Sequence, residues 1–202
     1  AIIMTHYAGY PCEIAKIKKI AKQRKLVLIE DAWHTIFSKF KKKYLGTDGD
    51  IGVFSLYGNK NITTGEGGIV IGKKDYIKRI KILRNHAIDR SMLERNLSKI
   101  PTYQINELGY NYRIDDIRAV IGMEQLKKID YLNNLRRKLA VNYKKLIFKE
   151  LPEIKIPFSN FIGYRFSYHL FPILLPNSLN RDNLIEFLSR KGIQTSIHYK
   201  PI

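Results

Sequence analysis

The sequence predicts an α/β protein with a mostly parallel sheet. Apolar runs of strand length lie at 26–30, 51–56 and 68–72, and they are rich in Ile, Val and Leu. Stretches with helical spacing of apolar residues lie between or after these runs. Strand and helix signals therefore alternate along the chain, which is typical of a layer of helices packed on parallel strands.

The first half of the chain supplies most of this pattern. We expect strands at 1–4, 26–30, 51–56 and 68–72. The run 26–30, LVLIE, has the continuous apolar character of a strand buried on both faces. A helix is expected at 12–25, where the apolar positions recur at intervals of three and four residues: Ile14, Ile17, Ile20 and Ala21. A second helix is expected at about 75–84.

The second half begins with a polar stretch at 86–107, which is long for a loop and is therefore a candidate functional segment. Asp115 and Asp116 are suited to start a helix, and a further helix is expected at about 133–148. A strand at 168–175, a helix at 181–191 begun by Asn180, and a strand at 192–199 follow. We therefore predict two domains: 1–139 as part of a large α/β domain and 140–202 as part of a smaller α+β domain.

Charge and composition restrict the function classes. The 202 residues include 36 Lys and Arg against 18 Asp and Glu, a formal net charge of +18 that is compatible with nucleic-acid binding. However, the lysines are spread over the polar faces of the expected helices, and the dense run at 39–44 is typical of a solvated hairpin tip. We therefore expect no nucleic-acid partner.

Other features favour a cytoplasmic protein without a metal. No apolar run approaches the roughly 18 to 20 residues of a membrane span, and the start of the chain lacks a signal-peptide pattern. The single Cys12 cannot form a disulfide within the chain, and the five His residues have no metal-ligand spacing.

Two of the expected strands end in residues with useful chemistry. Asp31 and His34 follow one strand, and Ser55 and Lys60 follow the next, with Lys60 29 positions after Asp31. In open α/β sheets, ligands bind at the carboxyl ends of the strands. Pyridoxal phosphate (PLP) requires a lysine, a carboxylate for its pyridine nitrogen and donors for its phosphate. The alternative for Lys60 is an ordinary solvated loop lysine.

Several motifs, in order and spacing, resemble those of the DegT/DnrJ/EryC1/StrS family of PLP-dependent aminotransferases, which act on nucleotide-linked keto sugars. They are IEDAWH, GDIGVFSLYGNKNITTGEGGIV, LRNHAIDR, LGYNYRIDDIRAVIGMEQLKKID, SYHLFPI and GIQTSIHYKPI. The similarity extends over nearly the whole chain. It implies the fold of the fold-type I PLP-dependent transferases, with PLP as cofactor.

The resemblance implies roles for three residues at the centre of the site. Lys60 would form the Schiff base with PLP and then transfer the proton as acid and base. Asp31 would pair with the pyridinium nitrogen and keep it charged, and its alternative role is to cap a following helix. His34 would lie near the phenolic oxygen of the ring, or would simply be a packed or capping histidine.

The remaining candidates lie further along the chain. Ser55 would donate to the cofactor phosphate, unless its hydroxyl only bonds the backbone at the end of the sheet. Asn111 would reach the phosphate bound by a neighbouring subunit, which implies a homodimer with shared sites, unless it is only a turn residue. Arg113, His169 and His198 would face substrate or the partner chain, or have structural roles.

The glycines of TTGEGG do not match the patterns of phosphate-binding loops. We expect Gly65, Gly67 and Gly68 to allow positive φ in the turn that follows Lys60.

By resemblance, the reaction transfers an amino group from a donor, expected to be glutamate, to a nucleotide-linked keto sugar for amino-sugar or surface-polysaccharide biosynthesis. Members of the family also carry an earlier phosphate-binding turn and a stacking aromatic residue, and they continue beyond HYKP. We therefore expect the chain to be the middle and later part of such an enzyme, and the isolated chain to bind PLP weakly or not at all. The alternatives are a truncated or catalytically silent homologue, a basic nucleic-acid-binding protein, and a PLP enzyme of another class such as a lyase.

Overall fold

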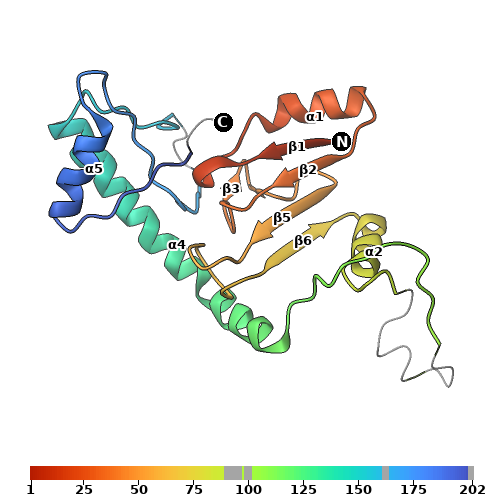
Figure 1. Cartoon of the computed structure of the whole chain (residues 1–202). Helices are drawn as coiled ribbons and strands as arrows, with labels where there is room; N and C mark the ends of the chain where they lie inside the picture. Colours follow the sequence, from red (N-terminus) through yellow and green to blue (C-terminus); the bar gives the residue numbers. More distant parts are fainter. Residues whose placement is uncertain (89–96, 98–101, 161–163, 200–202) are drawn as a thin grey trace.

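The computed structural model describes residues 1–88, 97, 102–160 and 164–199. Its main sheet has four strands in the order β1-β2-β5-β6 (Figure 1). β1, β2 and β5 are parallel, and β6 is antiparallel to β5. The α/β fold with a mostly parallel sheet is thus confirmed. The strands span Ile2–Thr5 (β1), Leu28–Asp31 (β2), Ile51–Ser55 (β5) and Gly68–Gly72 (β6).

One face of this sheet carries the core. Met4, Leu28 and Phe54 are buried on it, whereas on the opposite face Ile3 is 68% exposed and Val70 is 38% exposed. The prediction that the strand around 26–30 is buried on both faces is therefore wrong for the described part of the chain. In β2 buried and partly buried residues alternate, because successive side chains of a strand point to opposite faces.

Helix α1 (Ile14–Gln23) packs on the buried face, where Ile14 and Ala21 contact Met4 and Leu28. Before it, a single turn of 3-10 helix, η1, spans Tyr7–Gly9. The basic run at 39–44 forms the expected hairpin, β3 (Lys39–Phe40) and β4 (Lys43–Tyr44). The two residues of its turn have positive φ, as a tight two-residue hairpin turn of this type requires.

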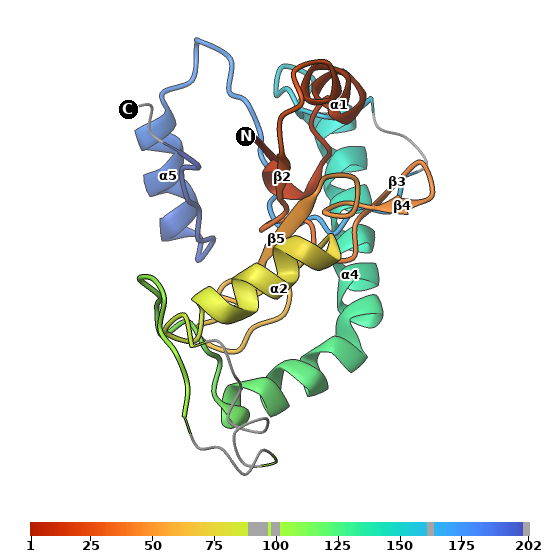
Figure 2. The same ribbon diagram turned by 90° about the vertical axis from the view of Figure 1, so that its right-hand side faces the viewer.

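A single long helix, α4 (Asp116–Glu150), replaces the two helices expected between 115 and 148. The side chain of Asp115 caps it by accepting a hydrogen bond from the N–H of Arg118 at 2.8 Å. The helix passes the end of β5 and continues towards α5 (Arg181–Arg190; Figure 1), and it extends along much of the molecule when the view is turned (Figure 2). It contributes Ile129 to the core cluster that contains Phe54. Helix α2 (Lys74–Leu83) lies next to β6.

The C-terminal part contains α5 (Arg181–Arg190), whose N-cap is Asn180 as expected. The predictions of strands at 168–175 and 192–199 are wrong, because neither of these described segments forms a strand. Only an isolated bridge joins Lys155 to Leu174, and an apolar cluster including Ile147 and Phe171 packs this region against α4. A strand-like residue pattern cannot form a strand without a neighbour that supplies a ladder of hydrogen bonds. The boundary at 139/140 stays a prediction; it falls inside α4.

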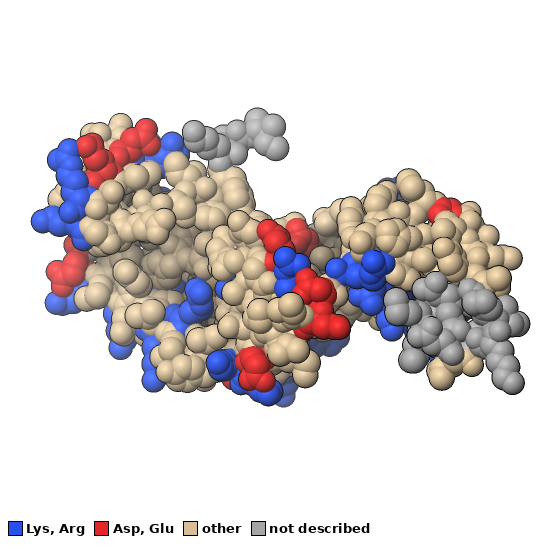
Figure 3. Space-filling view, turned by 60° about the horizontal axis from the view of Figure 1, so that its bottom comes forward, with Lys and Arg blue, Asp and Glu red and all other residues tan. Residues whose placement is uncertain are grey.

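The surface charge is dispersed on the face shown in Figure 3, where Lys and Arg side chains alternate with Asp and Glu over a largely uncharged surface. Among the described residues, no helix combines the length and apolar character that crossing a membrane requires. Most of the polar stretch at 86–107 lies outside the described residues.

Candidate active site

Several of the candidate site residues predicted from the sequence lie at the ends of the parallel strands β2 and β5. Asp31 ends β2 and Ser55 ends β5, and the turn after β5 presents Lys60, whose N–H donates to the carbonyl of Tyr57 at 3.0 Å. Lys60 is only 9% exposed. It is therefore a buried lysine, and the alternative of a solvated loop lysine does not apply.

The turn after Lys60 depends on two of the three predicted glycines. Gly65 has φ +78° and Gly67 has φ +153°, a region that residues with a Cβ rarely adopt. Gly68 instead starts β6 and does not have a positive φ. The turn leads the chain from Lys60 directly into the next strand.

His34 is buried beside this lysine and has a defined tautomer. Its Nδ1 accepts a hydrogen bond from the N–H of Ala8 at 3.1 Å, so the proton of the neutral imidazole is on Nε2. This Nε2 is buried and has no partner within the described structure. A buried donor without an acceptor is costly, so this N–H is available to donate to a bound ligand.

His169 lies next to His34, with the two ring centroids 4.3 Å apart. Its Nδ1 and Oδ1 of Asn61 are 3.0 Å apart, and because the amide oxygen can only accept, Nδ1 donates. The amide of Asn61 donates in turn to Asn133 of α4 and to the carbonyl of Ser167, both at 2.8 Å. This network fixes the residue that follows Lys60 to α4 and to the segment before His169.

Burial changes the ionisation of these groups. Desolvation, assisted by the positive charges nearby, lowers the pKa of His34 to about 3 and that of His169 to about 3. Desolvation also lowers the pKa of Lys60, whereas the negative charge of Asp31 opposes this shift. Both imidazoles are therefore neutral at neutral pH, and Lys60 releases its proton more readily than a solvated lysine.

The other candidates divide into two groups. His198 lies with the buried histidines, since its charge affects the pKa of both His34 and His169. Asn111 and Arg113 are exposed and lie beside Asn85 after α2: Asn111 pairs with it through the backbone, and Arg113 donates to its side chain at 2.8 Å. The structure does not bring these two residues into the hydrogen-bonded cluster around Lys60.

The structure also tests two of the alternative roles. No helix begins in the described segment directly after Asp31, at 32–38, so its carboxylate does not cap one. The hydroxyl oxygen of Ser55 accepts a hydrogen bond from the N–H of Tyr57 at 3.3 Å, which is the backbone role that had been left open. Its hydroxyl proton can still be donated to a ligand, because a hydroxyl both donates and accepts.

The residues at these strand ends fit PLP. Lys60 supplies the amine, Asp31 a carboxylate and Ser55 a hydroxyl, all at one edge of the sheet. The unpartnered Nε2–H of His34 adds a donor for an oxygen of the ring. In the order named, these four groups match the aldehyde, the ring nitrogen, the phosphate and the phenolic oxygen of the cofactor.

Sequence reasoning missed the pair formed by His6 and Glu30, both of which are fully buried. Glu30 immediately precedes Asp31 in the sequence. The carboxylate of Glu30 accepts from His6 Nε2 and from the N–H of Gly46, both at 2.9 Å, and from the N–H groups of Asp48 and Gly49. A carboxylate inside an otherwise apolar strand is a signal of such a pairing, because an unpaired buried charge is prohibitively costly.

Asn133 was also missed. It is buried on the same side of α4 as Ile129 and Ala140, four and seven residues away. An asparagine at a core position of an amphipathic helix indicates a buried hydrogen-bonding role.

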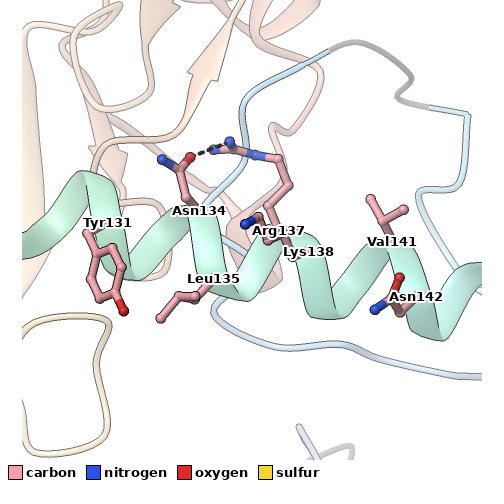
Figure 4. A pocket seen from close by; sticks show the side chains of 7 residues that line it. All are labelled: Tyr131, Asn134, Leu135, Arg137, Lys138, Val141 and Asn142. Carbon is pink, nitrogen blue, oxygen red and sulfur yellow. Dashed lines mark hydrogen bonds between the residues drawn. The ribbon is translucent and has the colours of Figure 1, made fainter.

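A separate open groove of about 560 Å³ lies along α4 (Figure 4). Arg137 lies at its centre and donates to the side chain of Asn134 at 2.7 Å. None of its lining residues belongs to the cluster around Lys60. They are Tyr131, Asn134, Leu135, Arg137, Lys138, Val141 and Asn142.

Comparison with known proteins identifies relatives of this chain. The chain is 41% identical over 207 residues to a Methanocaldococcus jannaschii protein named "Uncharacterized protein MJ1066", covering 100% of this chain and 53% of that protein. It is 35% identical over 204 residues to a Campylobacter jejuni protein named UDP-4-amino-4,6-dideoxy-N-acetyl-beta-L-altrosamine transaminase, covering 100% of this chain and 52% of that protein.

A solved structure also matches closely. Helicobacter pylori PseC, described as an aminotransferase involved in the biosynthesis of pseudoaminic acid, has a TM-score of 0.90 and 29% identity, covering 100% of this chain and 53% of that one. The chain thus spans about half the length of the relatives it matches. The model of the DegT/DnrJ/EryC1/StrS aminotransferase family matches residues 1–202. The chain therefore belongs to the DegT/DnrJ/EryC1/StrS aminotransferase family.

Proposed function

We propose that the full-length protein is a PLP-dependent aminotransferase that moves an amino group from glutamate to the keto group of a nucleotide-linked sugar. The observation that carries this proposal is the buried Lys60 beside Asp31 at the ends of two parallel strands. A lysine in this setting has a lowered pKa, as an amine that reacts with a carbonyl requires.

The residues divide the work of amino transfer. When bound, PLP supplies an aldehyde for the lysine and a charged ring that withdraws electrons from the reacting carbon. The carboxylate of Asp31 keeps the ring nitrogen protonated, and the Nε2–H of His34 donates to the ring oxygen. Lys60 Nζ takes and returns the proton at the reacting carbon. The hydroxyl of Ser55 binds the phosphate.

The names of two relatives support the proposed substrate class. The Campylobacter relative is named for a UDP-linked amino sugar, and the Helicobacter structure is of an enzyme in pseudoaminic acid biosynthesis. We propose that the product is an amino sugar for a surface polysaccharide and that it is made in the cytoplasm. The formal charge of +18 is compatible with an anionic nucleotide diphosphate.

For the remaining candidates we propose contacts with substrate or with a second chain. His169 and His198, together with Arg113, would contact substrate. Asn111 is exposed, which leaves its side chain accessible to a second copy of the chain. We propose a homodimer in which Asn111 reaches the phosphate of the cofactor bound by the partner.

The test is an amino-transfer assay on the full-length protein with PLP, glutamate and a UDP-linked keto sugar. We expect 2-oxoglutarate and the aminated sugar nucleotide in equal amounts, and loss of both products in Lys60→Ala. The matched control is Lys43→Ala, which removes an exposed lysine of the β3-β4 hairpin and should retain activity. A wild-type protein that forms neither product would contradict the proposal and favour a catalytically silent homologue.

A further inference from the structure

The side chain of Lys60 lies against the aromatic ring of Trp33. Lys60 Nζ lies over its indole, 4.0 Å from the ring centroid. The indole is held in place by stacking: its centroid is 3.7 Å from that of His34, at an interplanar angle of 22°, and it also stacks with Tyr199. The lysine head thus rests on a ring whose orientation its neighbours fix.

This geometry distinguishes the two protonation states of the lysine. An indole face attracts a cation within about 6 Å of its centroid, and tryptophan does so more strongly than tyrosine or phenylalanine. A neutral amine lacks this attraction. The contact therefore stabilises the ammonium form of Lys60, whereas burial of the same group favours the neutral amine.

The other groups that face Lys60 have defined effects. Asp31 favours the ammonium by its negative charge. His34 and His169 stay neutral well below pH 7, because burial lowers the pKa of each to about 3. The charge of His198 acts on both of these histidines. Among the groups named here, Asp31 and Trp33 favour the ammonium against burial.

We propose that Trp33 is a positioning residue: its indole face holds the Lys60 ammonium in place in the cofactor-free protein and so limits the fraction of Lys60 that is present as free amine. This inference rests on the proposed role of Lys60 as the cofactor-binding lysine. It assigns to Trp33 a function that packing alone does not require, since any large apolar side chain would fill the space.

The test compares Trp33→Leu with Trp33→Phe in the cofactor-free full-length protein. Leucine keeps the site apolar but removes the ring, whereas phenylalanine keeps a ring. The pH dependence of acetic anhydride labelling at Lys60, measured by peptide mass spectrometry, gives the midpoint of its ionisation, with the exposed Lys74 as internal reference. We expect Trp33→Leu to lower the midpoint by about half a unit to one unit, and Trp33→Phe to restore most of it. This shift corresponds to about three to ten times more free amine at neutral pH.

An unchanged or raised midpoint in Trp33→Leu would overturn the proposal. A second measurement needs no variant and so does not depend on its folding: in the wild-type protein, the indole ring current should move the ε-CH₂ proton signals of Lys60 upfield of those of Lys74. Signals at the ordinary lysine position would also overturn it. Both readouts concern the cofactor-free protein, so a protein that shows them but does not transfer amino groups would refute only the proposed function.

Discussion

The side chain of Asn61 donates a hydrogen bond to that of Asn133 at 2.8 Å, and this contact joins the residue after Lys60 to the middle of α4. Asn133 is 2% exposed and also donates to the carbonyl of Ile36 at 3.2 Å. The loop that presents the lysine is therefore anchored to the long helix through buried amides. Such anchoring fixes a catalytic side chain more tightly than a solvent-exposed loop could.

Loss of this anchor should destabilise the protein. Asn133→Leu leaves the amide of Asn61 with one acceptor fewer and the carbonyl of Ile36 without its side-chain donor, so we expect a loss of about 2 to 4 kcal/mol in the free energy of unfolding. Urea unfolding followed by circular dichroism measures it. Asn142→Ala, on the exposed side of the same helix, should change stability by less than about 0.5 kcal/mol. Equal effects of the two variants would contradict a special role for the buried amide.

The buried carboxylate of Glu30 makes a second prediction. Burial alone would raise its pKa, but the hydrogen bonds from His6 and from the amides of Gly49 and Gly46 outweigh burial, and the pKa is lowered. In Glu30→Gln the charge is lost and an NH₂ group faces backbone donors. We therefore expect the free energy of unfolding, measured by thermal unfolding, to fall by about 3 kcal/mol. Glu13→Gln is the control, because its pair with Lys16 is exposed and should contribute little. A Glu30→Gln protein as stable as the wild type would show that the pair is dispensable.

The two buried histidines predict a stability that depends on pH. Each has a pKa lowered from 6.5 to about 3 in the folded protein. Between these values the unfolded chain binds more protons than the folded one, so stability is fully present above about pH 6.5 and declines as the pH falls towards 3. The slope is at most about 1.4 kcal/mol per pH unit for each imidazole.

Two variants separate this effect from general acid sensitivity. In urea titrations between pH 7 and 4, His169→Gln should flatten the decline, since one of the two titrating groups is removed. His86→Asn should leave the slope as in the wild type, because His86 is exposed and its φ of +59° suits asparagine. If His169→Gln kept the full wild-type slope, the buried histidine could not be its source.

The sequence alone predicted the helices and strands that depend on local residue patterns. The four strands of the sheet, α1, α2, α5 and the caps Asp115 and Asn180 all lie within a few residues of their predicted places. The two strands expected after residue 160 fail because a strand requires a partner, which residue patterns alone do not specify. The prediction of two separate helices in place of α4 is wrong because no Gly or Pro lies near residue 133 to interrupt the helix.

For the site, sequence reasoning indicated Lys60, Asp31 and His34, which lie at or after the ends of apolar strands, and the family resemblance suggested their roles. It missed the residues that hold them in place. Trp33 and Asn61 adjoin them in the sequence but have no distinctive pattern. Their roles appear only when the fold places the indole beneath the lysine and the amide against α4.

The most direct test of the account is the position of the covalent bond to PLP. The full-length protein is incubated with PLP, its absorbance is recorded, and the complex is reduced with borohydride before peptide mass spectrometry. We expect an absorbance band near that of a lysine-bound cofactor and a reduced phosphopyridoxyl group on Lys60; both should be absent in Lys60→Ala and present in Lys43→Ala. A phosphopyridoxyl group spread over exposed lysines, with Lys60 unmodified, would contradict the central claim.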